Sequence, residues 1–347
     1  MHPVRRTIRL LRGALLLAAM IFSLSTCSGI GGSEFSGGGT GGTGISTGSI
    51  TGFGSVVMNG VHYHTDDEVS PRFRTKKIAR GQDRSNAKDR DLFQVGMVIT
   101  LRHSPGDNNA VEIDYEPNLV GPIAAKDSGP DLAIQVLGHS VLMDNAALFA
   151  SLAQDNVVEV SGYVDNSGRI RATFVEAMHP APIADETFEI KGFISGLRPS
   201  DGTDNTFEIG PLPDGSGITV TVSYTPGAVR ELPAGPANGM YVRVETRDTQ
   251  PGSGGIKAVN VTPFAPRTVF PEGATVDLDG LVTRIDSPSG NTLSFELEGK
   301  AVRTDAATVF LGGTGGGTGK DIRPNARVQV RGTEAGGVLS AVTIVFR

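Results

Sequence analysis

The chain has 347 residues, of which 47 are glycine and 20 are proline, and hydrophobic residues make up 38% of it. So much glycine and proline excludes a large helical protein, and the hydrophobic fraction excludes wholesale disorder. Four of the 31 basic residues lie within the first 26 positions, so the remainder carries 27 basic against 37 acidic residues, a net charge of −10. That diffuse negative charge repels phosphate backbones, so we expect no nucleic-acid partner.

The first 26 residues are expected to be a lipoprotein signal peptide. A positive segment from Arg5 to Arg12 precedes the apolar stretch from Gly13 to Leu24, which is too short to span a hydrocarbon core of about 30 Å. The only cysteine follows in Leu24-Ser25-Thr26-Cys27, which resembles the lipobox read by lipoprotein signal peptidase. The alternative is an ordinary secretory signal with an incidental cysteine. General secretion and twin-arginine export both stay open.

Cys27 has no partner for an intramolecular disulfide, and a lone thiol is a liability in an oxidising compartment. We therefore expect Cys27 to be lipidated and to anchor the chain to a membrane, because several acyl chains give stable anchoring. The expected location is the cell envelope, as an outer-membrane lipoprotein facing the periplasm or the cell surface. Residues 27–49 are rich in glycine and serine and are predicted to form a flexible tether.

After the tether, one pattern occurs four times along the chain. Each copy is predicted to open with an apolar-x-Gly element, to contain an alternating apolar strand, and to end with an Ala-led strand. The opening glycines are Gly52, Gly121, Gly192 and Gly280. The alternating strands are residues 99–101, 158–160, 242–244 and 328–330, and the final strands begin at Ala110, Ala172, Ala258 and Ala341. Four copies of one small module are therefore predicted.

Three of the copies contain a predicted hairpin, with turns at Asn59-Gly60, Gly138 and Gly299, because glycine allows the positive φ of tight turns. The third copy replaces the turn with a longer segment from Gly210. Each copy then has about five short strands, and closure into a barrel removes the unpaired edges of so small a sheet.

The predicted fold is all-β, with four tandem five-to-six-stranded barrels of the oligonucleotide/oligosaccharide-binding (OB) type; an SH3-like barrel is the second choice. The predicted boundaries are 1–26 for the signal, 27–49 for the tether, and 50–116, 117–180, 187–265 and 274–347 for the barrels. One long sandwich is the alternative. The Pro-rich segments 179–186 and 262–273 argue against it, because such spacers separate folding units.

The first copy contains ITGFGSVVMNGVHY from Ile50, and the second ends with GRIRATFVE from Gly168. Both stretches resemble the bacterial family known as domain of unknown function 5666, which occurs in tandem in secreted and lipid-anchored proteins. The resemblance implies a small β-barrel module outside the cytoplasm. It implies no catalytic residues.

Two catalytic motifs are imitated but fail in their context. Gly44 to Gly48 satisfies G-x-S-x-G, but a nucleophile elbow needs a strand before it and a helix after it, and the motif lies in the predicted tether. Gly312 to Asp321 imitates a phosphate loop, but Thr314 stands where the first glycine is needed and Asp321 replaces the magnesium-binding Ser/Thr. We expect a loop between strands there. No enzyme and no cofactor are predicted.

Two further groups are candidates for binding. His62 and His64 lie on the same face of a predicted strand, a weak candidate for a metal site, with a solvated strand face as the preferred interpretation. A basic run in the first copy is either a solvated loop or a patch for an anionic ligand. Its candidate residues are Arg72, Arg74, Lys76, Lys77, Arg80 and Arg84.

Two functions compete at this point. The first is a non-catalytic, lipid-anchored envelope protein whose barrels act as a spacer or as a docking surface for another envelope protein. The alternative is a lipoprotein that binds an oligosaccharide or an anionic envelope polymer. Sugar platforms need exposed aromatic rings, and the chain has no Trp and only five Tyr, which favours the first function.

Overall fold

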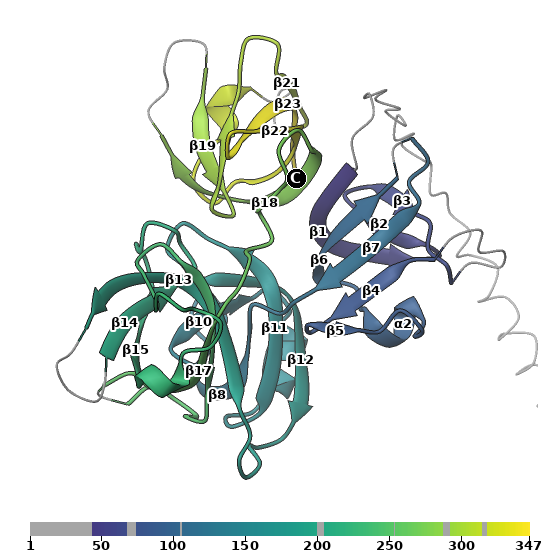
Figure 1. The fold of residues 1–347 in the computed structure, drawn as a ribbon. Coiled ribbons are helices and arrows are strands. Elements are labelled where there is room, and N and C mark those ends of the chain that lie inside the picture. The colour runs from purple at the N-terminus through teal and green to yellow at the C-terminus, as the bar shows by residue number, and fades with distance from the viewer. Residues whose placement is uncertain are drawn as a thin grey trace, which may run out of the picture. The chain divides into compact units, whose positions relative to one another are not determined.

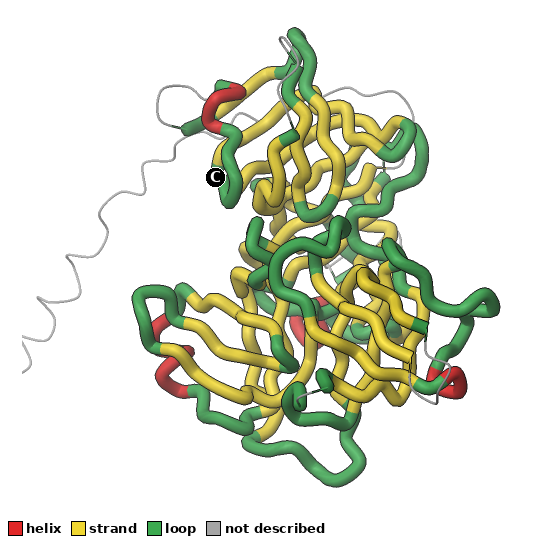
Figure 2. Tube along the Cα trace, turned by 90° about the vertical axis from the view of Figure 1, so that its left-hand side faces the viewer, coloured by secondary structure: helices red, strands yellow, loops and turns green. Residues whose placement is uncertain are grey.

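The computed structural model describes residues 44–67, 74–104, 106–199, 205–252, 254–286, 292–313 and 318–347. Within these ranges strands dominate, and helices are confined to one or two turns (Figures 1 and 2). The predicted signal peptide, Cys27 and Arg72 lie outside the described residues. The all-β prediction is confirmed.

The strands fall into four groups that follow one another along the chain. The first group is β1 (Gly44–Phe53), β2 (Val56–Met58), β3 (Val61–Tyr63), β4 (Lys76–Ala79), β5 (Gln82–Asp83), α2 (Asp89–Leu92), β6 (Val98–His103) and β7 (Ala110–Tyr115). The second is β8 (Leu119–Asp127), β9 (Ala133–Val136), β10 (His139–Met143), α3 (Ala146–Ser151), β11 (Val157–Val164) and β12 (Ile170–His179).

The third group is β13 (Phe188–Arg198), β14 (Asn205–Gly210), β15 (Val220–Tyr224), the 3₁₀ turn η1 (Pro226–Ala228), β16 (Tyr241–Thr246) and β17 (Ile256–Pro263). The fourth is β18 (Thr275–Ile285), β19 (Ser294–Leu297), β20 (Lys300–Arg303), β21 (Val309–Leu311), the 3₁₀ turn η2 (Gly319–Asp321), β22 (Arg327–Ala335) and β23 (Val338–Phe346).

Each group closes in the same Greek-key order. In the second barrel β8, β9 and β10 form an antiparallel meander, β10 pairs with β12 in parallel, β12 pairs with β11, and β11 returns to β8. The third and fourth barrels repeat this circuit strand for strand. In the first barrel a parallel bridge between His64 and Asn109 joins the β3 side to the β7 side. This is the OB-like barrel that the sequence predicts.

The three predicted hairpin turns are confirmed. Each places two consecutive residues at positive φ, as a two-residue hairpin of type I′ requires. The pairs are Asn59 (φ 55°) with Gly60 (77°), Leu137 (48°) with Gly138 (82°), and Glu298 (51°) with Gly299 (77°). In the third barrel a longer connection joins β14 to β15, in agreement with the sequence.

A second repeated feature corrects the alignment of the first copy. Gly121, Gly192 and Gly280 pair with the first valines of the alternating strands, Val158, Val242 and Val328. In the first barrel the residue opposite the equivalent Ile99 is Gly48. The true counterpart of the opening glycines is therefore Gly48, four residues before the predicted Gly52.

A bulge at the start of each final strand explains the repeated alanine. The register slips by one residue directly after Ala110, Ala172, Ala258 and Ala341. Bulges increase the local twist and bend a strand, which helps a small sheet to close. In the second barrel the residue opposite Ala172 is Gly162, where an added Cβ would lie 2.2 Å from the carbonyl oxygen of Arg171.

The predicted tether is wrong for residues 44–49, because they form the first half of β1. They pair with β6 on one side and, from Gly44 to Thr47, with β18 of the fourth barrel on the other. Small side chains suit this position: a Cβ on Gly44 would lie 2.1 Å from the His103 ring, and one on Gly48 would lie 2.3 Å from Asn59 Oδ1. The glycines here serve close packing and not flexibility.

Of the two Pro-rich segments, residues 262–273 connect the third and fourth barrels, which lie in different sheets, whereas residues 179–186 do not separate the second barrel from the third. The parallel pairing of β1 with β18 joins the first and fourth barrels into one 13-stranded sheet. The antiparallel pairing of β8 with β13 joins the second and third barrels into a 10-stranded sheet. The cores follow the same division: the second and third barrels share one cluster, and Ile45 of β1 packs into the core of the fourth barrel. Neighbouring barrels thus cover each other's strand edges.

Candidate functional site

Buried polar contacts fix the second barrel against the fourth. The Tyr163 hydroxyl, on β11, donates to Asp279 Oδ2 on β18 at 2.6 Å and accepts from the backbone N–H of Ser49 at 2.8 Å. Arg327 Nη2 donates to the same Asp279 oxygen at 2.7 Å. Burial and the charge of Asp279 raise the pKa of Tyr163, so the phenol stays protonated. These partners come from three barrels, and they hold the surrounding surfaces in a fixed relation.

A cleft of about 710 Å³ lies beside this contact, between β12 of the second barrel and the segment that leads into β22 of the fourth. Its volume falls within the range of small-ligand sites, about 300–1,000 Å³. Four arginines line it together with two carboxylates. The arginines are Arg171, Arg323, Arg327 and Arg347, and the carboxylates are Asp144 and Asp321.

Arg323 and Arg327 flank a tight turn at the mouth of the cleft. The N–H of Ala326 donates to the carbonyl of Arg323 at 2.9 Å, and Asn325 has a φ of 66°. Proline followed by a residue at positive φ is the signature of a type II turn. Asn325 Oδ1 accepts from the N–H of Asn166 at 2.8 Å, which ties the turn to the second barrel.

The same turn occurs in every barrel, but its arginines are confined to the fourth. The positions equivalent to Arg323 hold Gln94, Ala153 and Ala237, as the matching turn hydrogen bonds show. Arg327 pairs with the residue that directly follows the opening glycine of its barrel. In the other three barrels the residues with this pairing are Val98, Val157 and Tyr241. The barrel fold therefore does not require arginine at either place. The sequence analysis did not predict the cleft, because its lining combines residues of two copies. The arginines that the fourth copy has at these two positions, where the other copies have none, are nevertheless visible in the sequence.

Arg171 forms the opposite wall of the cleft. It lies on β12, and its Nε is buried without a hydrogen-bond partner among the described residues. A buried guanidinium N–H without an acceptor is costly, and such groups call for an explanation. A ligand oxygen in the cleft would supply the acceptor.

The residues of the basic run predicted in the first barrel have different environments in the structure. Lys77 is 1% exposed, and its Nζ contacts Asp66, Asp67 and Asp89 at 3.0, 2.8 and 3.0 Å. Burial lowers the pKa of Lys77, but hydrogen bonds to the three carboxylates more than offset this and hold the pKa above its ordinary value. Lys77 is thus an internal ion and is not part of a surface patch.

Arg80 is also paired within the protein, although its own side chain is 45% exposed. Its Nε lies 2.5 Å from Glu159 Oε2 in the second barrel, and Glu159, 0% exposed, also accepts from the Tyr115 hydroxyl at 2.7 Å. Lys76 forms a surface pair with Glu112 at 3.0 Å. Arg74 and Arg84 are exposed. Of the five described candidates, these last two have side chains without an ion pair among the described residues.

The two histidines are both at the surface. His62 is exposed and lies 3.4 Å from Ser55 Oγ through Nδ1, and His64 is exposed beside the bridge to Asn109. Asp66 and Asp67, which follow the pair, turn to Lys77. In the part of the chain that the structure describes, no three His, Cys, Asp or Glu residues gather at metal-binding distances.

The two sequence motifs that imitate catalytic motifs lie in structural elements that do not suit catalysis. Ser46 of the G-x-S-x-G pattern is fully buried in the middle of β1, and its hydroxyl lies 2.6 Å from the Tyr63 hydroxyl. No helix follows it directly, so no nucleophile elbow exists there. In the phosphate-loop imitation Asp321 caps the short turn η2 by accepting from the N–H of Thr318 at 2.8 Å. Residues 314–317 of this second motif, Thr314 among them, lie outside the described residues. In their described residues neither motif forms a catalytic arrangement.

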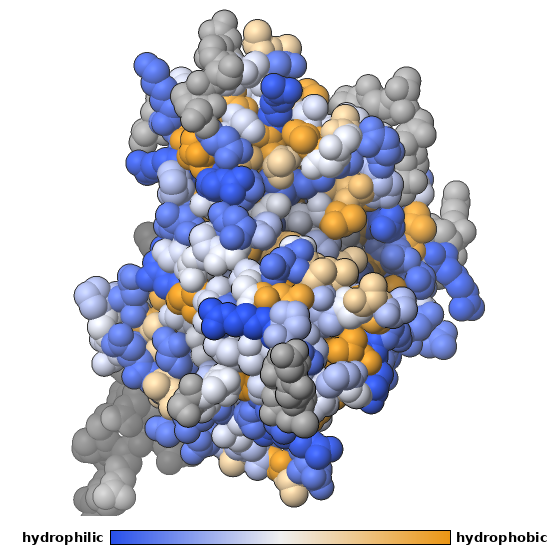
Figure 3. Space-filling view, turned by 60° about the vertical axis from the view of Figure 1, so that its left-hand side comes forward, coloured by the Kyte–Doolittle hydropathy of each residue, from blue (hydrophilic) through white to orange (hydrophobic). Residues whose placement is uncertain are grey.

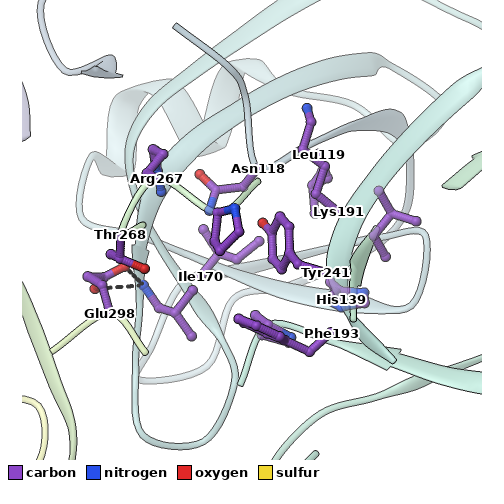
Figure 4. Close-up of a pocket in the computed structure, with 14 residues that line it drawn as sticks. Asn118, Leu119, His139, Ile170, Lys191, Phe193, Tyr241, Arg267, Thr268 and Glu298 are labelled. Carbon is purple, nitrogen blue, oxygen red and sulfur yellow. Dashed lines mark hydrogen bonds between the residues drawn. The ribbon is translucent and has the colours of Figure 1, made fainter. Parts of the chain in front are cut away.

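A second, smaller cavity of about 50 Å³ lies where the second, third and fourth barrels meet (Figure 4). Tyr241, His139 and Glu298 line it. Burial lowers the pKa of His139 to about 4, so the ring is neutral at pH 7. Both oxygens of Glu298 accept from the N–H of Val164 at 3.2 Å, and Oε1 accepts from Leu281 at 3.0 Å. The space is large enough for water and too small for a metabolite.

Glu298 predicts a pH dependence of stability. Burial raises the pKa of its carboxyl from 4.5 to about 7, against the lowering effects of the Leu281 N–H and Arg267. The folded state therefore binds the proton more tightly than the unfolded state. This contribution to stability is full below pH 4.5 and is lost as the pH rises through 7. We expect Glu298→Gln to make the fall in melting temperature between pH 5 and 8 shallower.

The measurement is the melting temperature of both proteins across that pH range. Asp131→Asn is the matched control, because the Asp131 side chain is 68% exposed, and its pH profile should follow the unaltered protein. Parallel profiles for Glu298→Gln and the unaltered protein would contradict the assignment.

The family model of domain of unknown function DUF5666 matches residues 120–176 and 279–345. The similarity to the DUF5666 family is thus found in two segments of the chain. They comprise most of the second barrel and most of the fourth, so the two DUF5666 copies form the two walls of the arginine-lined cleft. The first and third barrels lie outside the matched segments but share the circuit of the DUF5666 barrels. The family description carries no activity.

No curated protein matches the chain. Among solved structures, one described as "drosophila Unr CSD456" is similar, with 13% sequence identity and a TM-score of 0.17. The match covers 50% of this chain and 79% of that one. A TM-score this low supports no conclusion about this chain.

The large hydrophobic side chains that the described surface exposes are aliphatic. The exposed large hydrophobic side chains are Val95, Val111, Met178, Ile183, Val269, Val309 and Val342, with no aromatic ring among those described. On the face in Figure 3 hydrophobic residues occur in small groups among hydrophilic ones. Within the described ranges no helix has the length and apolar character needed to cross a membrane.

Proposed function

We propose that the chain is a non-catalytic, lipid-anchored protein of the cell envelope, in which four joined OB-like barrels form a rigid docking body. The observation that carries this proposal is the edge-to-edge joining of the barrels, through β1 with β18 and β8 with β13. A catalytic centre needs a nucleophile or acid–base group that is positioned and accessible. The candidate Ser46 is instead buried in a barrel contact.

Rigid joining favours docking over a flexible spacer. Barrels linked only by coils would change their spacing freely, whereas paired strands and buried contacts such as Tyr163 with Asp279 fix it. A partner that contacts two barrels at once then meets both surfaces without an ordering cost. Val309 and Val342 are 49% and 60% exposed on the adjacent strands β21 and β23, where a partner could bury them.

Attachment by lipid predicts that the chain incorporates a fatty acid through Cys27. We expect cells that express the full chain to transfer labelled palmitate to it, and Cys27→Ser to abolish the label, because serine offers no thiol for the acyl-glyceryl group. Ser28→Ala is the control and should be labelled normally. Equal labelling of the Cys27→Ser variant would contradict the anchor.

Docking is tested by a photo-crosslinking amino acid at Val342 in living cells. A rigid docking surface predicts one adduct of defined mass. A probe at Gln250, in an exposed loop of the third barrel, serves as the control. A diffuse ladder at both positions would contradict a specific docking role.

The arginine-lined cleft favours a second function, which is the binding of an anionic envelope polymer. Its support is the set of guanidinium groups around one space of ligand size. The basic run of the first barrel supports it less, because Lys77 and Arg80 are used internally.

A further inference from the structure

We propose that the cleft between the second and fourth barrels binds an acidic oligosaccharide, whose carboxylate groups are held by Arg171 and Arg323. The inference rests on the proposed envelope location, where such polymers are accessible to the chain. It assigns the ligand class and the residues that select it.

The charges of the lining suit a sugar that carries both carboxylate and hydroxyl groups. The side chains of Arg171 and Arg323 form no ion pair or hydrogen bond with another group of the described residues, whereas Arg327 is paired with Asp279. Planar guanidinium groups bind carboxylates through two parallel hydrogen bonds. Asp144 and Asp321 on the same lining can accept from hydroxyls. They repel a phosphate dianion more strongly than a carboxylate, which carries a single negative charge.

The two arginines are held on opposite walls that cannot easily separate. Arg171 extends from β12, which pairs along its length with β11, and Arg323 precedes the turn that Asn166 ties to the second barrel. Tyr163 and Asp279 close the base of the same region. A site whose walls are fixed before binding loses less entropy when the ligand arrives.

Recognition in this cleft would depend on charge and hydrogen bonds and not on stacking. The Tyr163 ring lines the cleft, but the Arg327 guanidinium lies over it at 4.9 Å from the ring centre. The ring face is therefore already occupied by a cation–π contact. Phe346, the other aromatic residue of the lining, is partly buried against the core of the fourth barrel. We therefore expect the carboxylates of the sugar to carry the selectivity.

The test is a titration of the full chain, purified in detergent, with an oligogalacturonate of three to five sugar units, measured by calorimetry. We expect binding that weakens as salt is raised, because the contacts are ionic. Arg171→Gln and Arg323→Gln should each weaken binding about tenfold or more, the range for loss of a charge-assisted hydrogen bond. Arg303→Gln is the matched control, because Arg303 is exposed on β20, outside the cleft, and should bind normally.

Any one of three results would overturn the inference. The first is equal affinity of the two cleft variants and the unaltered chain, with melting temperatures that show all of them folded. The second is equally tight binding of the same oligosaccharide after its carboxyl groups have been reduced to neutral alcohols. The third is binding of inorganic polyphosphate but not of the uronate. None of these results affects the proposed lipid anchor, which is tested by labelling at Cys27, or the proposed docking role, which is tested by crosslinking at Val342.

Discussion

Lys77→Met is expected to destabilise the first barrel by about 3–5 kcal/mol, the range for breaking a buried ion pair by removing one partner. The ammonium of Lys77 meets Asp66, Asp67 and Asp89, and it also donates to the carbonyl of Ala87 at 2.9 Å. Without it the three carboxylates would repel one another, with Asp89 buried and Asp66 and Asp67 partly exposed. Calorimetric melting of the full chain should show the loss as a lowered first transition.

The pH response separates this cause from a packing defect. Protonation relieves repulsion among carboxylates, so the deficit of Lys77→Met should shrink as the pH is lowered from 7 toward 4. Lys76→Met is the control, because Lys76 is half-exposed and its pair with Glu112 lies at the surface, where such pairs contribute about 0–1 kcal/mol. A deficit of the same size for both variants would contradict the role given to Lys77.

Gly162→Ala and Gly332→Ala are expected to destabilise their barrels by about 1–3 kcal/mol or more, as overpacking does. A Cβ on Gly162 would lie 2.2 Å from the Arg171 carbonyl oxygen, and one on Gly332 would lie 2.2 Å from that of Ser340. Both obstacles are backbone atoms of a paired strand, which cannot rotate away. Because the two glycines face the same bulge in two copies, their effects should be similar.

Gly254→Ala is the control for this pair. Gly254 has open space around its Cα and no positive φ, so its substitution should change the melting temperature little. Melting by circular dichroism and calorimetry measures all three variants. A harmless Gly162→Ala would show that the β11–β12 contact can relax.

The local elements were predictable because single residues determine them. The Asn59-Gly60 turn and the alternating Val242 to Val244 strand follow from backbone φ and from the period-two burial of a strand. The start of β1 was not predictable by these rules. Its Gly and Ser residues have the composition of a tether, and the strand is stable because β6 and β18 lie on its two sides.

The candidate site was hidden for a different reason. Arg171 and Arg323 are 152 positions apart, and their approach depends on how two barrels pack, which no local pattern encodes. The basic run is the opposite case, because the sequence predicts a candidate patch that the structure divides. Lys77 is counted as surface charge in the sequence but is buried in the fold. Charge in a sequence indicates a patch only where the fold leaves it unpaired.

The pairing of β1 with β18 has a consequence for assembly. One edge of β1 stays unpaired until the chain beyond Thr275 has emerged, so two segments far apart in the sequence must meet before this edge is covered. Contacts of such high sequence separation form slowly. During that interval the open edge is a template for pairing with other chains, so a copy that stops before the fourth barrel should aggregate.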